Sequence, residues 1–210
     1  MAGEMGVGAL GTTLLSPVSV LGEMLREHDR GLADCKAPAG LFVNREKGCF
    51  TFVHVAESRQ AAIDNGAAWS ALWYVNAAPK VFKVPRRVWY DMIKAGLHPN
   101  SARDTSAQAE MDPNELAIHP DDPEVVRVLK RMAQGEEISF EAAHAALEPL
   151  DSVVIGDPAH CIEKLKGYQA IGADRAMCMM QYGAIPHAAV LRSLALAGSD
   201  VMPAFAGTMA

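Results

Sequence analysis

The sequence lacks the features that mark a disulfide scaffold, a common zinc site or a nucleic-acid surface. Its 210 residues include four cysteines, which form no CxxC pair and no zinc-type spacing: Cys35, Cys49, Cys161 and Cys178. This pattern argues against both a disulfide framework and a structural metal site. Lys and Arg number 19 against 25 Asp and Glu, for a net charge of −6. No basic stripe can neutralise phosphates, so nucleic acid is not an expected partner.

Long apolar runs and a targeting signal are also missing. No stretch reaches the roughly 18 apolar residues that a membrane helix requires, and residues 1–8 lack the charged region of a secretory signal. Together with the unpaired cysteines, this predicts a reducing, cytoplasmic setting and no contact with a membrane. Half of the residues are hydrophobic, which is enough for one sizeable core in a single domain over residues 1–210.

Four short apolar segments predict buried parallel strands, at residues 7–13, 49–55, 152–155 and 176–180. Amphipathic helical patterns and Gly/Pro turns separate these segments, which is typical of a parallel sheet wrapped by helices. A further apolar run at residues 41–44 precedes a polar turn and is a weaker strand candidate than the segment after that turn.

The first helical pattern begins at Ser16 and Pro17, which fit an N-cap and the first helical position. A longer pattern covers residues 56–76 and carries Trp69 and Trp73, whose spacing of four places both indoles on one face. Packing of these indoles onto the sheet is favoured over a ligand role, because buried aromatics chiefly supply core area.

The last third of the chain carries the clearest helix signals. Asp157 and Pro158 fit the N-cap and first position of a helix, and Gly172 fits its C-terminal cap. A second helix is expected to begin near Pro186 and to stop at Pro203.

Residues 79–150 form the least regular part of the sequence. A short helix is expected before Gly96, a polar loop over residues 98–122, and helices beginning at Pro123 and Ser139. A loop of that length inside a compact domain is usually functional or mobile.

No self-contained catalytic motif is present: there is no nucleophile elbow, no HExxH and no phosphate loop. Catalytic residues and metal ligands are therefore not assigned. His54 ends a predicted strand, where barrel enzymes place active-site residues, although a structural histidine is the more common outcome. His187 is expected at a helix N-terminus, and His98, His119 and His144 are expected to face solvent.

Six short motifs follow one another between residues 156 and 203: Gly156-Asp157-Pro158, Gly172-Ala173-Asp174, Gln181-Tyr182-Gly183, Pro186-His187, Val190-Leu191-Arg192-Ser193 and Asp200-Val201-Met202-Pro203. No single motif is specific, but the ordered set is hard to obtain by chance. In this order the motifs resemble the C-terminal end of the bacterial-luciferase-like, flavin-dependent monooxygenases.

The resemblance implies an α/β fold of the (β/α)8 TIM-barrel type, which needs ~250 residues when complete. This chain is shorter and carries a helical and loop insertion at about residues 79–150, before the last strand. Residues 7–13 correspond to the sixth barrel strand of the family. We therefore expect an incomplete barrel with strands six to eight only, left by truncation, frameshift or gene fission.

The resemblance also implies reduced FMN as cofactor, supplied by a separate flavin reductase, with O2 as co-substrate and a small-molecule substrate that the sequence does not identify. Family positions place Thr12 and Thr13 beside the flavin ring, Trp89 next to the flavin, and Gln181 at the end of the last strand. The flavin-phosphate site and the principal catalytic histidine of the family come largely from the first five strands. The chain alone is therefore expected to bind FMN weakly and to be inactive.

Two alternatives stay open. The chain could be a non-catalytic half-barrel that folds only with a partner, either a missing N-terminal half or another copy in a homo-oligomer, because a lone half-barrel leaves two unpaired edges and an open inner face. It could also be a relative of the F420-dependent reductases, although the amino-acid sequence of residues 69–76 is more similar to that of the luciferase-like enzymes.

Overall fold

The protein is a mixed α/β structure built on parallel strands. The computed structural model describes residues 1–82, 85–95 and 115–207, so most of the loop expected over residues 98–122 lies outside the described residues. The strands are β1 (Ala9–Thr12), β2 (Lys47–Val55), β3 (Val154–Gly156) and β4 (Arg175–Met179). All pairings are parallel, and β2 is central, with β1 and then β3 along one edge and β4 along the other. The expected four parallel strands are thereby confirmed.

Side chains alternate between two faces of the sheet. Gly11 faces helix α1 (Val18–Ala33), because a Cβ there would lie 2.3 Å from Cδ1 of Leu21. Its neighbour Leu10 points the other way, toward Gly48, where a Cβ would lie 2.9 Å from Cδ1 of Leu10. We call the α1 side the outer face and the opposite side the inner face.

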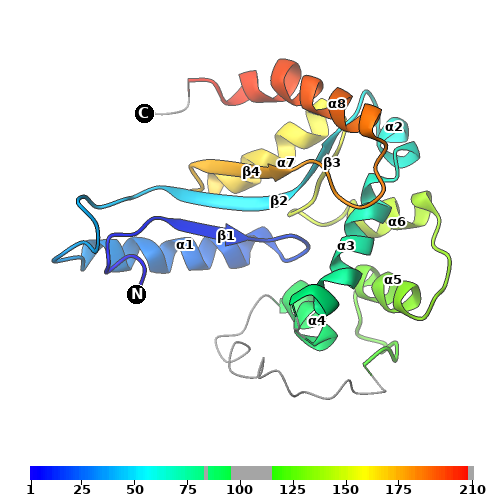
Figure 1. Ribbon diagram of the computed structural model, residues 1–210, viewed down its shortest axis with the longest axis horizontal. Coiled ribbons are helices and arrows are strands. Elements are labelled where there is room, and N and C mark those ends of the chain that lie inside the picture. Colours follow the sequence, from blue (N-terminus) through cyan, green and yellow to red (C-terminus); the bar gives the residue numbers. More distant parts are fainter. Residues whose placement is uncertain (83–84, 96–114, 208–210) are drawn as a thin grey trace.

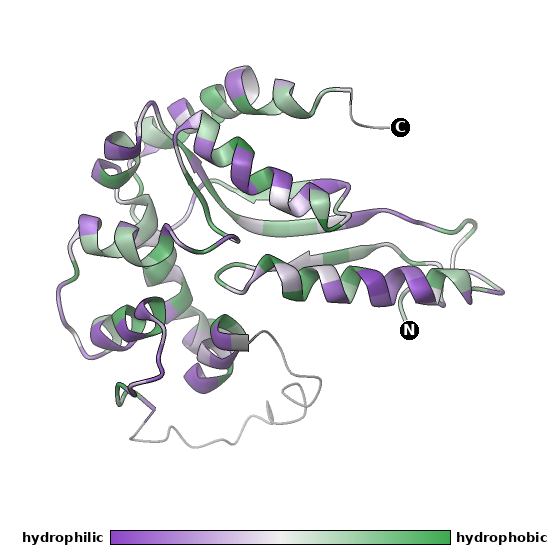
Figure 2. Cartoon of the chain, turned by 180° about the vertical axis from the view of Figure 1, so that it is seen from behind, coloured by the Kyte–Doolittle hydropathy of each residue, from purple (hydrophilic) through white to green (hydrophobic). Residues whose placement is uncertain are grey.

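Helices cover the outer face and gather beyond the strand ends. The remaining ones are α2 (Arg59–Asp64), α3 (Ala67–Phe82), α4 (Arg86–Ala95), α5 (Glu124–Ala133), α6 (Phe140–Leu147), α7 (Pro158–Ala170) and α8 (His187–Leu196). In Figure 2, α1 and α7 lie in front of the strands. In Figure 1, α2 to α6 lie past the C-terminal ends of the strands.

Two apolar clusters hold these layers together, since burial of apolar surface is the main stabilising term. The outer cluster joins the outer face of β2 to α1 and α7, with members that include Leu21, Leu25, Cys49, Val53, Val55, Cys161 and Tyr168. The inner cluster joins Phe52 of β2 to the α2–α6 helices, with members that include Leu72, Val126, Leu129, Leu147 and Tyr182.

The prediction of a single helix over residues 56–76 is wrong in both the length and the continuity of the helix. It is two helices, α2 and α3, separated at Gly66, whose φ of +66° lies in the left-handed region that favours glycine. A Cβ on Gly66 would lie 2.8 Å from the ring of Phe140, so α6 occupies the space beside the break. α3 then continues through Pro79 to Phe82.

The C-terminal helix also runs further than expected. α8 passes into a π-helical turn (Ala197–Val201) and a 3-10 turn (Met202–Phe205), so Pro203 lies within the helical stretch instead of stopping it. The span His187–Phe205 has the length and apolar composition of a membrane-crossing helix, and about 22% of it is buried. The sequence had been expected to contain no apolar stretch of that length. One side of it packs on the sheet, where Ser193 Oγ accepts a hydrogen bond from the Val55 N–H at 2.8 Å.

Three smaller expectations need correction. Residues 41–44 form no strand, and Leu41 and Phe42 are strongly exposed. His144 is 2% exposed instead of solvated, and Cys178 is exposed, whereas a core position was expected. The Asp157 cap is confirmed, because its Oδ1 accepts the His160 N–H at 2.9 Å.

Candidate functional site

The candidate site is the edge of the sheet where β1, β2 and β4 end. The three strands are parallel, so their carboxyl ends meet at one edge, which is where barrel enzymes carry their active sites. The inner face leading to this edge is uncovered over the flanking strands, with Leu10 of β1 59% exposed and Met177 of β4 52% exposed. In Figure 1 no helix covers these strands from the viewer's side.

The two threonines that end β1 point to opposite sides. Thr12 is exposed on the inner side, and its hydroxyl donates to the Phe50 carbonyl at 3.3 Å. Thr13 is 1% exposed, and its Oγ1 lies 2.6 Å from the hydroxyl of Tyr168 on the outer-face helix α7. Thr12 is therefore open at the strand edge, and its place beside a flavin stays a prediction, whereas Thr13, expected beside the same ring, is buried against α7.

Thr13 belongs to a buried hydrogen-bond network below the end of β1. Tyr168 donates to the Ser152 carbonyl at 2.7 Å, and Thr51 Oγ1 donates to the same carbonyl at 2.6 Å. Because the Tyr168 proton is used in this way, Thr13 must donate to the Tyr168 oxygen. Burial raises the pKa of Tyr168, which keeps its proton in place. The network fixes α7 to the sheet and leaves the Thr13 hydroxyl no free capacity to donate to a ligand.

Gln181 lies at the end of β4 in a segment that is anchored to α3. Gln181 itself is exposed. The next residue, Tyr182, is buried with its ring centroid 4.8 Å from that of Phe52. Gly183 has a φ of +56°, and a Cβ there would lie 2.5 Å from Cβ of Ser70. Only glycine allows this close approach to α3, and the approach leaves Gln181 open at the strand edge.

Trp89 is a half-buried residue of α4 that packs against the inner cluster. Its ring centroid lies 6.1 Å from that of Phe82, at an interplanar angle of 36°. The indole Nε1 is buried and has no hydrogen-bond partner in the described part of the chain. A buried donor without a partner is uncommon in native proteins, so Trp89 combines a packing role with an unused N–H.

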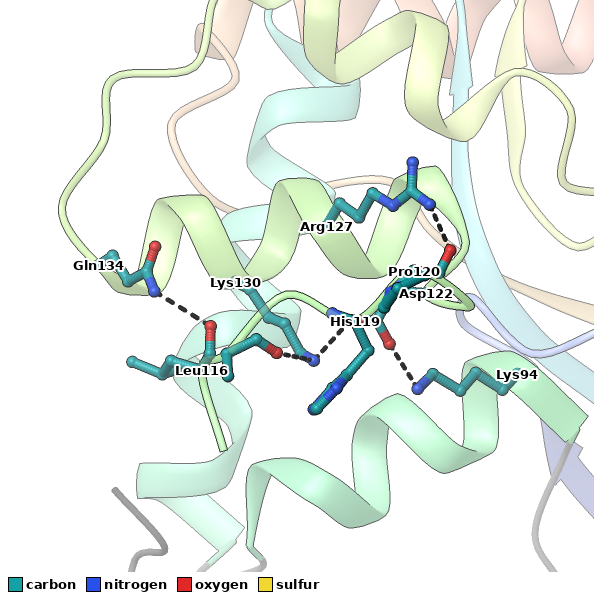
Figure 3. Close-up of polar contacts among 9 residues, drawn as sticks. Lys94, Leu116, His119, Pro120, Asp122, Arg127, Lys130 and Gln134 are labelled. Atoms are coloured by element: carbon teal, nitrogen blue, oxygen red, sulfur yellow. Dashed lines mark hydrogen bonds and ion pairs between the residues drawn. The ribbon is translucent and has the colours of Figure 1, made fainter. Parts of the chain in front are cut away.

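A buried carboxylate fixes the helix that carries Trp89, as Figure 3 shows. Asp122 accepts Lys94 Nζ of α4 at 2.5 Å and Lys130 Nζ of α5 at 2.6 Å. It also accepts the N–H of His119 at 2.9 Å. Burial alone would raise the pKa of Asp122, but these three donors outweigh it and hold the pKa well below its usual range. No local sequence signal pointed to this residue.

His54, at the end of β2, is fully buried instead of lining an open site. Its Nε2 lies 3.1 Å from Asn65 Nδ2, so the amide donates and the imidazole accepts, which places the ring proton on Nδ1. Burial lowers the pKa of His54 to about 4, with smaller and opposing effects from Glu57 and Arg192. A neutral, buried imidazole at this position has a structural role.

The described residues offer binding groups more than acid–base groups. In residues 1–82, 85–95 and 115–207 no group of three His, Cys, Asp or Glu side chains could hold a metal ion. The open edge presents the Thr12 hydroxyl, the Gln181 amide and an apolar wall that includes Met177. The Trp89 indole lies on α4, which packs against α3.

Comparison with known proteins gives a solved structure of similar fold. No family model and no curated protein sequence matches the chain. Among solved structures, the coenzyme F420-dependent tetrahydromethanopterin reductase from Methanopyrus kandleri matches 97% of this chain, with a TM-score of 0.51 and 13% sequence identity. The match covers 47% of that enzyme, so this chain spans about half its length.

A likeness at this identity concerns the fold alone. The likeness supports a mixed α/β fold with a parallel sheet and does not show membership of the bacterial luciferase family.

Proposed function

We propose that this chain is the C-terminal part of a luciferase-like oxidoreductase barrel, an incomplete (β/α)8 unit that forms one wall of a flavin-type cofactor site. The observation that carries the proposal is the exposed apolar inner face, which leads to the shared carboxyl edge of β1, β2 and β4. A monomeric protein rarely leaves such a face uncovered unless it binds something.

A complementary set of βα units completes the barrel in this proposal. Among the described residues β1 and β4 pair only with β2, so each presents an unpaired parallel edge, which is an aggregation hazard unless covered. β1, β2 and β4 correspond to three of the eight strands of a barrel. A second copy would supply only three more strands, whereas an N-terminal half would supply five. The N-terminal half is therefore the preferred partner over a homo-oligomer.

The cofactor proposed here is reduced FMN, which when bound supplies electrons to O2 for oxygenation of a small-molecule substrate. The Nε1–H of Trp89 has no partner among the described residues but is buried, so it donates to a carbonyl oxygen of a flavin-type ring only where cofactor binding exposes it. Thr12 and Gln181 are placed to bind the ring edge from either side of β2. The apolar inner face, with Met177, excludes water from the bound ring.

A deazaflavin is the second candidate cofactor, favoured by the F420 dependence of the solved neighbour. In that case the chain belongs to a reductase and O2 is not a co-substrate. The FMN proposal implies a separate flavin reductase as partner. A cytoplasmic setting accompanies both, supported by the four free cysteines of the chain.

A titration of the isolated chain tests the proposal. Charge-assisted contacts are the strong part of phosphate binding, and in this proposal they come from the N-terminal half of the barrel and not from residues 1–210. Weak or absent binding of FMN and of F420 is therefore expected, followed by tryptophan fluorescence. Co-expression with the N-terminal half of a luciferase-like enzyme should restore binding of one of the two cofactors. A sub-micromolar dissociation constant for the chain alone, about −8 kcal/mol or better, would refute the fragment argument.

A non-catalytic half-barrel remains the alternative outcome of the same experiment. If the reconstituted complex is stable and monodisperse but binds neither cofactor, the chain is a structural subunit. The Trp89→Phe variant then separates the roles of that residue. Loss of cofactor affinity with unchanged unfolding midpoint supports the indole N–H contact, because the phenyl ring retains most of the packing area.

A further inference from the structure

A second recess lies between α3 and the 135–138 turn that joins α5 to α6. It encloses about 440 Å³, within the range of small-ligand sites. Figure 1 places this turn on the far side of α3 from the strands, so the recess is separate from the open inner face.

Two indoles form one wall of the recess. Trp69 and Trp73 lie four residues apart on α3 and both line it. Trp69 is half-buried, with its ring centroid 6.4 Å from that of Phe140. Trp73 is 46% exposed, contrary to the expectation that both indoles pack onto the sheet. An accessible indole face attracts cations through its quadrupole.

The opposite wall is a preorganised acidic turn. α5 ends in a Schellman motif, in which Gly135 has a φ of +90°, its N–H donates to Met132 O at 3.1 Å, and the Glu136 N–H donates to Arg131 O at 3.0 Å. Arg131 Nε also binds the Glu136 carboxylate at 2.8 Å, so that charge is compensated. Glu137 forms no ion pair with another described residue, and its charge adds to the negative end of the α5 dipole.

Asn76, Met132 and Ile138 line the recess between the two walls. The Asn76 amide nitrogen donates to the Leu129 carbonyl at 3.1 Å, and its buried Oδ1 has no partner within the described ranges. Ile138 and Met132 complete an apolar lining. The recess therefore combines aromatic faces with one uncompensated carboxylate, and no cationic side chain lines it.

We propose that this recess binds an organic cation, an ammonium or guanidinium group on an apolar stem. The indoles and Glu137 recognise the charge, and Ile138 and Met132 contact the stem. The source is either a free small amine or a basic side chain of another protein. The proposal is independent of the barrel function, because no residue of the strand edge takes part in it.

The test is an NMR titration of the full chain that follows the three indole N–H signals, with choline and n-butylguanidinium as probes. 3,3-Dimethylbutan-1-ol serves as the neutral isostere of choline. Both cations should shift the Trp69 and Trp73 signals but not that of Trp89, and the neutral alcohol should bind at least roughly fivefold more weakly. Equal binding of cation and alcohol, or no shift with either cation, overturns the proposal.

Matched variants locate the charge that is recognised. Glu137→Gln should weaken choline binding by roughly three- to tenfold, whereas Glu141→Gln, an exposed residue of α6 outside the recess, should leave it unchanged. Equal loss in the two variants would mean that only the general negative charge of the chain matters. A short arginine-containing peptide that binds much more tightly than n-butylguanidinium identifies a protein side chain as the source, and equal affinities identify a free amine.

Discussion

The two faces of the sheet differ in how completely the chain covers them. On the outer face, Cys49, Val53 and Val55 of β2 are at most 2% exposed beneath α1 and α7. On the inner face, Leu10 and Met177 keep more than half of their surface in water. The central strand β2 is therefore buried beneath α1 and α7, whereas β1 and β4 are open on the inner face, and the exposed Cys178 shows that β4 is also open on its outer face.

This difference shows which part of the fold the chain can stabilise by itself. The outer layer is built from contacts between this chain's own strands and helices, and its polar atoms are joined in the Thr13–Tyr168–Ser152 network. The inner face is closed only near the strand ends, where Phe52 packs edge-on against Tyr74 at 5.5 Å. The rest of the inner face gains its apolar stabilisation only when another segment covers it.

A matched pair of leucine truncations gives the most direct test of this difference in burial. Leu25 of α1 is 1% exposed within the outer cluster, whereas Leu10 is 59% exposed on the inner face. Leu25→Ala should lower the free energy of unfolding by about 2–5 kcal/mol through lost burial and a cavity. Leu10→Ala should change it by no more than about 0.5 kcal/mol. Urea unfolding followed by circular dichroism measures both.

The Leu10 result also reports on the partner. In a complex with the N-terminal half, the same Leu10→Ala change should become destabilising, because the side chain is then buried. If Leu10→Ala already costs as much as Leu25→Ala in the isolated chain, the inner face is covered by the chain itself or by a second copy, and the proposed partner is wrong.

Local signals in the sequence were enough to predict the strands and most helix ends. Short apolar runs marked all four strands, and Asp157, Pro158 and Gly172 bounded α7 as expected. Such signals act within a few residues, through side-chain caps and left-handed backbone, so they are visible without the fold. The incomplete barrel implied by the luciferase-like order of motifs stays a prediction.

Features that depend on distant residues were not predictable in this way. The break at Gly66 is set beside Phe140 of α6, and Thr13 turns outward because Tyr168 of α7 meets it. Asp122 lies in a polar stretch that reads as loop, yet Lys94 and Lys130 converge on it from two helices. The burial of His144 likewise comes from packing partners far from it in sequence.

The second prediction concerns the covered end of the inner face, where His54 is buried in neutral form. Its pKa is lowered from 6.5 to about 4 by burial, so the unfolded chain takes up a proton before the folded chain does. The contribution to stability is complete above pH 6.5 and is lost as the pH falls toward 4, by up to ~3 kcal/mol. Urea unfolding at pH 7.0, 6.0 and 5.0 should show this decline.

Two variants assign the pH dependence. His54→Gln should flatten the decline between pH 7.0 and 5.0. Burial also lowers the pKa of His144. His144→Gln should therefore remove only the contribution of His144 to the pH dependence of unfolding and should leave the contribution of His54 in place. An unchanged pH profile in His54→Gln means that the imidazole is accessible to solvent, and the inner face is then open even at the strand ends.

The smallest predicted effect compares two buried tyrosines, one for each apolar cluster. Tyr168 in the outer cluster uses its hydroxyl twice, with Thr13 and with the Ser152 carbonyl, whereas the buried hydroxyl of Tyr182 in the inner cluster has no partner among the described residues. Tyr168→Phe removes both hydrogen bonds and leaves a buried acceptor less well satisfied, so it should cost about 1–2 kcal/mol. Tyr182→Phe removes only an unsatisfied group, so it should be neutral or slightly stabilising. Equilibrium unfolding in urea measures both variants. Because each variant loses one hydroxyl oxygen, the difference between them reports the hydrogen bonds and not the packing. An equal cost at the two sites would mean that Tyr182 is bonded to a buried water, and the inner cluster would then be hydrated where the outer one is dry.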